Sequence, residues 1–511
     1  MTTITTPRHQ APEPDGDAEH LSELGYSYET KFERDVTFWG NVSLGFTYLS
    51  PVVGIYTLFA SSLGIGGPPM IWSLLIVGVG QFLVAQVFSE VVSSYPVAGG
   101  IYPWSRRLWG RKWGWMSGWI YLFALLTSIA TVGYGAGPYV ADLFGFEPGV
   151  DTTIAAAIIL IAISTTLNLC GTKILNTVAM IGLIAELGGA ILVGSWLLTA
   201  SRNQDISVIF QTFGAGGGDG YFAAFAAAGL IGIFQYYGFE ACGDVAEEVK
   251  NPGTTIPKAM RVTIYIGGAA SMFVCLSLLL AVPDFGAVIS GADPDPVHSA
   301  LASAFGAVGV KVVLAVVMIS FVSCLLSFQA ATSRLTYAMG RDRMLPLSDL
   351  WTRFSKSRRV PPFALLLAGV APALIVLLSK FSEEGLMAIM SFATMGIYLA
   401  FQMVVLASLR ARLKGWKPGG QFKLGKWGAP VNMLALAWGV TGMINMAWPR
   451  TPDGPWWENW LTLLTSALVV GAGLLYMGWK KPHLRGHAPA ADAIPTPGSA
   501  TFSLVPEDTG A

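Results

Sequence analysis

Long apolar stretches alternate with short polar segments from about residue 36 to residue 480. A helix rises 1.5 Å per residue, so about 20 apolar residues cross the ~30 Å hydrocarbon layer of a bilayer. The pattern therefore predicts an all-α membrane protein with twelve transmembrane helices in one domain, 36–480. The expected spans are 36–62, 70–95, 113–141, 152–170, 174–200, 221–247, 258–283, 309–336, 362–380, 385–408, 429–449 and 459–479.

The two ends of the chain differ from this pattern. Residues 1–35 and 481–511 are polar and proline-rich, which is typical of disordered tails. The N-terminal segment lacks the basic start and short apolar core of a signal peptide.

The distribution of lysine and arginine predicts the orientation of the spans. With both termini in the cytoplasm, all but four of the 31 basic residues fall on the cytoplasmic side. Cytoplasmic loops of membrane proteins carry such an excess. The sequence thus predicts cytoplasmic tails and a multi-pass protein of the plasma membrane, surrounded by lipid. The four exceptions are Arg202, Lys311, Lys380 and Arg450.

Two of the predicted spans carry helix-breaking residues near their centres. The first span has Pro51 and Gly54, and the sixth has Gly232, Gly238 and Gly243. The sixth span comes five spans after the first, so these helices would run in opposite directions. Paired breaks of this kind indicate a five-plus-five inverted repeat, with the last two spans left over, and mark secondary transporters.

Backbone groups freed by a break within lipid must face protein, water or a ligand. A half-helix starting near Gly54 would direct its positive end into the site, where a carboxylate could bind. Neighbouring aromatic side chains could close over a substrate or stabilise an ammonium group, although packing is the common role of a lone aromatic. The candidate substrate-binding residues are Ser50, Pro51, Val53, Gly54, Phe234, Tyr236, Tyr237, Gly238 and Phe328.

Two acidic residues inside the spans are candidates for ion coupling. Glu186 stands alone in an apolar helix, where an uncompensated charge costs about 3 kcal/mol or more. Glu240 lies just beyond the second break and is a candidate proton carrier, or else a cap on the unwound backbone. We expect the neighbouring acids Asp244, Glu247 and Glu248 to be hydrated or paired with basic residues.

Composition narrows the function further. Hydrophobic residues make up 53% of the chain and charged residues 12%, against roughly 25% charged in soluble proteins. The net charge is zero, which gives no reason to expect a nucleic-acid partner. The histidines lie outside the apolar spans, and no GxxxxGK[ST] loop is present, so we expect no metal, no cofactor, no ATP site and no enzymatic activity.

Several long motifs resemble the amino acid–polyamine–organocation superfamily, and most closely its amino acid/choline branch, which includes GABA permeases. The resemblance covers roughly residues 35–480. Its motifs occur in order at the ends of spans 2, 6 and 8. They are Ser89-Glu90 with 95–102 and Trp104, then 238–240 with 247–252 and 256–259, and finally 333–338 with Arg341-Asp342 and Leu345-Pro346.

The resemblance implies a LeuT-like fold with substrate held at the broken spans 1 and 6. It places Phe234 and Phe328 where related exchangers have tryptophan gates, and Glu240 where they have a glutamate important for transport. Glu186 falls where a proton-coupled relative has a lysine, close to a sodium site in others. One departure is that Val52 and Val53 replace the usual small residues of span 1. These β-branched side chains should hinder a substrate carboxylate.

The sequence therefore predicts an importer of amino acids or related amines such as GABA, choline, ethanolamine or polyamines. It would work by alternating access and be driven by protons or sodium, with protons favoured. Two alternatives stay open at this point: an exchanger without net ion coupling, and a transporter-like nutrient sensor.

Overall fold

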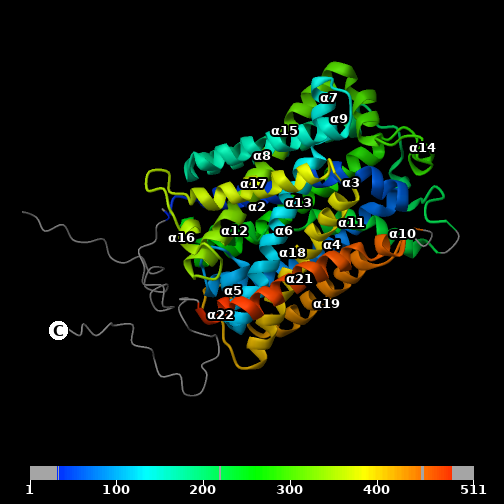
Figure 1. Ribbon diagram of the computed structural model, residues 1–511. Coiled ribbons are helices and arrows are strands. Elements are labelled where there is room, and N and C mark those ends of the chain that lie inside the picture. Colours follow the sequence, from blue (N-terminus) through cyan, green and yellow to red (C-terminus); the bar gives the residue numbers. More distant parts are fainter. Residues whose placement is uncertain (1–31, 33, 218–219, 382, 451–453, 486–511) are drawn as a thin grey trace, which may run out of the picture.

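A computed structural model describes residues 32, 34–217, 220–381, 383–450 and 454–485. These residues form an elongated bundle of helices, with two isolated β-bridges, Val36–Val249 and Ser355–Val360 (Figure 1). One end of the bundle holds α5 (Ile101–Trp109), α16 (Ser348–Trp351) and α22 (Pro482–Arg485) and is called the α5 end below. The opposite end holds α10 (Tyr221–Ala228) and α14 (Phe285–Ile289).

Helical segments occupy all twelve of the predicted ranges. In the described part of the chain, nine helices are long and apolar enough to cross a membrane, and Tyr221–Gln235 and Pro362–Leu378 are shorter apolar helices. The longer helices are α2 (Phe38–Leu49), α3 (Pro51–Gly66), α4 (Ile71–Ser94), α6 (Arg111–Gly135), α8 (Val150–Leu169), α9 (Thr172–Thr199), α13 (Pro252–Ala281), α15 (Pro296–Arg341), α17 (Pro362–Leu378), α18 (Glu383–Leu413), α19 (Gly428–Ala447) and α21 (Leu461–Lys480).

Shorter segments complete the bundle, and most of them join longer helices. They are η1 (Pro68–Met70), α7 (Gly137–Phe144), η2 (Ile206–Phe210), α11 (Leu230–Gln235), α12 (Ala241–Asp244), η3 (Ala246–Glu248), η4 (Gly425–Trp427) and α20 (Trp456–Asn459).

The outer surface of the bundle is apolar. Ile184, Leu192, Leu468 and Leu475 expose more than half of their surface, although they belong to long hydrophobic helices. Exposed apolar side chains of this kind on long hydrophobic helices suit lipid rather than water.

The first predicted break lies at Ser50, and the half-helix α3 begins at Pro51 rather than near Gly54. Ser50 has φ 38° and ψ 90°, and it caps both α2 and α3. Proline suits the first position of a helix because its missing N–H would be unpaired there and its φ is preset. Gly54 is helical, since its N–H donates to the carbonyl oxygen of Ser50 at 3.0 Å.

The second break divides the sixth predicted span. Helix α11 ends at Gln235, and α12 begins only at Ala241. Gly238 lies between them with φ 121°, a value that side chains with a Cβ atom rarely adopt. The polypeptide is therefore non-helical within both predicted spans, at Ser50 in the first and between Gln235 and Ala241 in the second.

Most of the predicted tails lies outside the described residues. Phe32, within the predicted N-terminal tail, is buried against Tyr337 and Phe354, with ring centroids 5.3 and 5.0 Å away. Within the predicted C-terminal tail, α22 follows directly after α21.

Candidate functional site

The two breaks face each other at the centre of the bundle. A Cβ atom added to Gly238 would lie 2.6 Å from the backbone nitrogen of Leu49, so only glycine lets these segments approach so closely. Gln235 joins them, because its side-chain amide donates to the carbonyl oxygen of Leu49 at 3.1 Å. Its Oε1 lies beside Gly54, where an added Cβ atom would be 2.1 Å away. Gly54 is thus required for space beside Gln235.

Glu186, on α9, reaches the beginning of α3. Its Oε1 accepts a hydrogen bond from the Ser50 hydroxyl and another from the backbone N–H of Val52, both at 2.8 Å. The N-terminus of a helix carries unpaired N–H groups and a partial positive charge, which stabilise this carboxylate. The side chains of Val52 and Val53 thus do not keep the carboxylate of Glu186 from this backbone, while their effect on a substrate carboxylate stays a prediction. The contact is made through the backbone, on which the β-branched side chains do not intrude.

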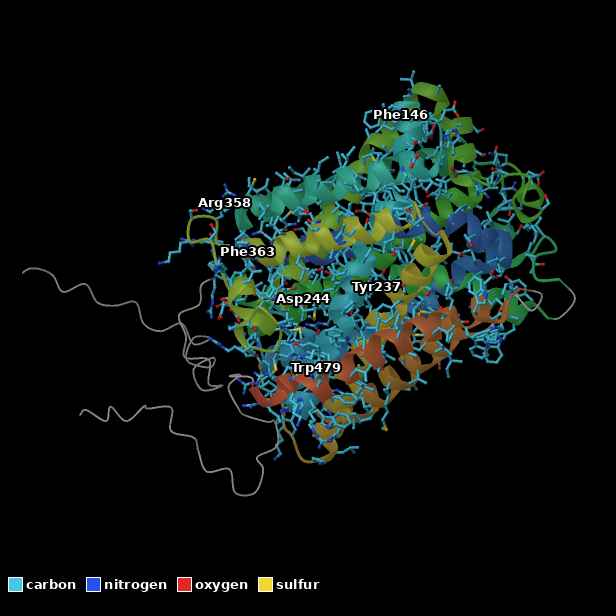
Figure 2. All side chains as sticks on the ribbon, viewed as in Figure 1. Phe146, Tyr237, Asp244, Arg358, Phe363 and Trp479 are labelled. Carbon is cyan, nitrogen blue, oxygen red and sulfur yellow. The ribbon has the colours of Figure 1, made fainter. Side chains whose placement is uncertain are left out.

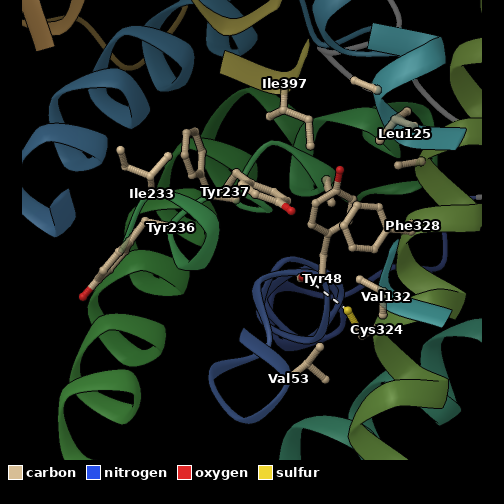
Figure 3. Packing of buried hydrophobic residues seen from close by; sticks show 14 of the residues in the cluster. Tyr48, Val53, Leu125, Val132, Ile233, Tyr236, Tyr237, Cys324, Phe328 and Ile397 are labelled. Carbon is tan, nitrogen blue, oxygen red and sulfur yellow. Dashed lines mark hydrogen bonds between the residues drawn. The ribbon is translucent and has the colours of Figure 1, made fainter. Parts of the chain in front are cut away.

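An aromatic cluster, made of Tyr48, Phe234, Tyr237 and Phe328, lies between the breaks and α15. Tyr48 and Phe328 stack with their ring centroids 3.8 Å apart. Tyr237 contacts Tyr48, Phe234 and Phe328 through T-shaped pairs with centroids 5.6 to 6.3 Å apart. Figure 3 shows Tyr48, Tyr237 and Phe328 converging, whereas Tyr236 points away from them. Its ring lies against Gly78 and Gly268.

Two buried carboxylates share one tyrosine on the α5 side of the cluster. The hydroxyl of Tyr121, on α6, lies 3.3 Å from Oε1 of Glu240 and 3.1 Å from Oδ2 of Asp244. Oε2 of Glu240 accepts a hydrogen bond from the backbone N–H of Gly238 at 2.7 Å, so this side chain also caps the unwound backbone. Tyr48 lies near both acids. Figure 2 shows Asp244 and Tyr237 well inside the bundle.

Asp244 does not fit the expectation of a hydrated or ion-paired residue. It is fully buried, and the hydrogen-bond partner of its Oδ2 is Tyr121 rather than a basic side chain. Its neighbours do follow that expectation. Glu247 pairs with Arg341 at 2.9 Å, and Glu248 pairs with Arg334 at 2.8 Å.

These ion pairs belong to a polar network at the α5 end. Arg334 and Glu248 are both buried, and Oε2 of Glu248 also accepts a hydrogen bond from Thr172. Asp342 accepts a hydrogen bond from the hydroxyl of Tyr102 at 2.9 Å. The bridge between Val36 and Val249 ties the chain before α2 to the same region.

The structure thus brings most of the predicted site residues together and leaves one apart. Ser50, Pro51, Val53, Gly54 and Gly238 form or flank the facing breaks, and Phe234, Tyr237 and Phe328 belong to the aromatic cluster. Glu186 and Glu240 each cap one break, while Tyr236 lies between α4 and α13. Two residues that sequence reasoning did not single out, Tyr121 and Gln235, also belong to the site, and so does Asp244, which the sequence analysis placed in a hydrated or ion-paired setting.

The donor set at the site does not resemble a metal centre. In the part of the chain that the structure describes, no group of three or more His, Cys, Asp or Glu side chains is placed to hold a metal ion. The chemistry available at the breaks is instead that of carboxylates, amide oxygens, hydroxyls and aromatic faces.

Comparison with known proteins places the chain in a family. The sequence model of the amino acid permease family matches residues 38–491. Amino-acid permease BAT1 of Arabidopsis thaliana is 26% identical over 84% of this chain and 88% of its own length. The serine/threonine exchanger SteT of Bacillus subtilis is 26% identical over 68% of this chain and 76% of its own. The choline transporter of Saccharomyces cerevisiae is 24% identical over 82% of this chain and 77% of its own.

The family match spans both breaks, the aromatic cluster and both candidate coupling residues. The chain belongs to the amino acid permease family, within the amino acid–polyamine–organocation superfamily, and is a membrane transporter rather than an enzyme.

Proposed function

We propose that this protein imports amines or amino acids across the plasma membrane by alternating access around the two breaks. The observation that carries the proposal is the facing pair of breaks, each capped by a buried carboxylate. Twelve spans in a five-plus-five inverted repeat plus two further helices suit this mechanism. The excess of lysine and arginine supports a cytoplasmic position for the α5 end and for both termini.

In the described conformation, the polar network would close the cytoplasmic side. Inward opening then requires the Arg334–Glu248 and Arg341–Glu247 pairs to separate, because both lie between the breaks and the α5 end. The aromatic rings of Tyr48, Tyr237 and Phe328 must also part to admit a substrate, since they contact one another.

Proton coupling at Glu240 and Asp244 is the second part of the proposal. The hydroxyl of Tyr121 carries one proton, so it satisfies one of the two carboxylates at a time. Like charges buried so close together are unfavourable, and a shared proton removes one of them. Because Glu240 also holds the second break through Gly238, a change in its protonation would alter the backbone at the substrate site.

Replacing Glu240 with glutamine tests this coupling. The new amide would keep a side-chain oxygen for the N–H of Gly238 but could not exchange a proton. We expect concentrative uptake driven by a proton gradient to fall to background in proteoliposomes, while exchange of substrate across the membrane continues. The matched control is Glu147→Gln, which removes an exposed carboxylate far from the breaks. Concentrative uptake by the Glu240→Gln variant would contradict the coupling role.

Glu186 is a second candidate coupling residue. Its Oε1 accepts two hydrogen bonds, whereas its Oε2 is buried without a hydrogen-bond partner and could take a proton or contact sodium. Glu186→Gln is expected to abolish gradient-driven uptake and to spare exchange. Repeating the assay with a sodium gradient and with a proton gradient identifies the ion. Normal concentrative uptake by this variant would exclude Glu186 as the coupling group.

An exchanger without net ion coupling is the alternative function, favoured by the similarity to the serine/threonine exchanger SteT. The same vesicles distinguish it. Uptake that requires substrate inside and ignores both ion gradients would establish exchange and overturn the coupled mechanism.

A further inference from the structure

We infer that the substrate is an organic ammonium ion that carries N–H donors and no carboxylate, such as ethanolamine or putrescine. This inference rests on the proposed transport function and narrows its substrate class. Amino acids and GABA, which carry a carboxylate, would be poor substrates. Three features of the site support it: occupied anion-binding donors, unpaired acceptors, and an excess of negative charge beside aromatic rings.

The donors at the beginning of α3 are already used by the protein. Oε1 of Glu186 accepts hydrogen bonds from the N–H of Val52 and from the hydroxyl of Ser50. The carboxylate of this side chain thus occupies the place where a helix N-terminus would otherwise bind the carboxylate of a substrate.

The remaining donors of that turn have partners too. Pro51 has no N–H. The N–H of Val53 donates to the hydroxyl oxygen of Ser50 at 3.4 Å, and that of Gly54 donates to the Ser50 carbonyl oxygen at 3.0 Å. No backbone donor of the first turn of α3 therefore stays available for a ligand.

The second break shows the same arrangement. The N–H of Gly238 donates to Glu240, so a carboxylate of the protein again occupies a backbone donor at the break. To reach the N–H of Val52 or of Gly238, a substrate carboxylate would have to displace Glu186 or Glu240.

Three buried atoms around the breaks are acceptors without a hydrogen-bond partner, and the hydroxyls of Tyr48 and Tyr237, which can donate or accept, are without one as well. Oε2 of Glu186, Oε1 of Gln235 and Oδ1 of Asp244 are each buried without a hydrogen-bond partner. All three are acceptors. An ammonium group supplies up to three N–H donors and would satisfy such atoms, whereas a carboxylate supplies none.

Charge and aromatic faces favour the same ligand. Glu186, Glu240 and Asp244 are acidic, and in the described part of the chain no lysine or arginine is among the groups that perturb them. Tyr48 and Tyr237 lie close enough to Glu240 to interact with it electrostatically, and Phe328 stacks on Tyr48. Aromatic faces stabilise ammonium groups. The acidic side chains and the aromatic faces thus favour a cationic ligand at the breaks.

Pairs of ligands that differ only by a carboxylate test the inference in the full-length protein. Ethanolamine is compared with serine, and putrescine with ornithine, as competitors and as radiolabelled substrates in proteoliposomes. We expect each amine to be transported with an apparent affinity about tenfold or more above that of its amino acid. An equal or reversed preference would overturn the inference while leaving the transport function intact.

Two variants of Glu186 connect this preference to the proposed subsite. Glu186→Ala frees the donors of Val52 and Ser50, so the preference for ethanolamine over serine should shrink by about tenfold. Glu186→Gln retains an oxygen acceptor for both donors, so the preference should persist even where coupling is lost. Glu147→Gln controls for loss of a carboxylate elsewhere.

The outcomes also separate this inference from the proposed function. If no amine and no amino acid is transported or exchanged, the proposed function fails, and the inference fails with it. If the native protein prefers amines but Glu186→Ala retains the full preference, the assignment of the occupied subsite to Glu186 is wrong. If Glu186→Ala does not fold, the preference of the native protein and of Glu186→Gln still decides the inference.

Discussion

Replacing Arg334 with methionine is expected to destabilise the protein by about 3–5 kcal/mol, because it leaves the carboxylate of Glu248 buried and without its charged partner. Both side chains of the pair are buried, and after the substitution Glu248 would retain only the hydrogen bond from Thr172. The thermal unfolding midpoint of the purified full-length protein in detergent measures this effect. We also expect a substrate leak through the α5 end, since the network proposed to close it would be broken.

A second variant tests whether the unpaired charge is the cause. The double variant Arg334→Met with Glu248→Gln removes both charges and should regain most of the lost stability. Arg343→Met is the matched control, because Arg343 pairs with Asp349 at the surface and such pairs contribute only about 0–1 kcal/mol. Equal midpoints for Arg334→Met and Arg343→Met would refute the importance of the buried pair.

Replacing Gly238 with alanine is expected to abolish transport. The backbone at this position has φ 121°, and a strained conformation of this kind costs about 1–3 kcal/mol for other residues. The new Cβ atom would also lie 2.5 Å from Cδ1 of Tyr48 and 2.6 Å from the backbone nitrogen of Leu49. The two breaks would have to move apart, which would displace Glu240 from its contact. Substrate binding and uptake in proteoliposomes measure the loss.

Gly471→Ala in α21 provides the control for this substitution. An added Cβ atom there meets no other heavy atom within 4 Å, and alanine is a better helix former than glycine. Normal expression and uptake are therefore expected. Uptake by Gly238→Ala at the level of Gly471→Ala would show that the close approach of the breaks is not needed for transport.

Much of the fold could be predicted from the sequence because lipid imposes simple rules on it. Apolar length locates the spans, and proline and glycine locate the breaks to within a few residues. The half-helix α3 begins at Pro51, about one turn before the predicted start near Gly54. Proline and glycine both break helices, so the sequence did not show which of the two marks the start. Only the tertiary structure shows that the side chain of Gln235 leaves no room for a Cβ atom at position 54.

The chemistry of the site was less accessible to sequence reasoning. Asp244 looks like any acidic residue near a span end, and its environment is set by Tyr121, which is more than a hundred residues away in the chain. Tyr236 and Tyr237 are adjacent and were indistinguishable in sequence. The unwound backbone between α11 and α12 turns them in different directions, and only Tyr237 joins the aromatic cluster. A signal for Gln235 was present, since a buried amide beside a predicted break needs a partner.

The first break is held from two sides by different helices, and this has a mechanical consequence. Glu186 attaches the start of α3 to α9, and Gln235 attaches the end of α2 to α11, while Ser50 alone joins the two halves. Any displacement of α9 relative to α11 therefore acts as a torque on the Ser50 linkage and turns one half of the first span against the other. A substrate that pulls on either anchor would bend the span at this joint.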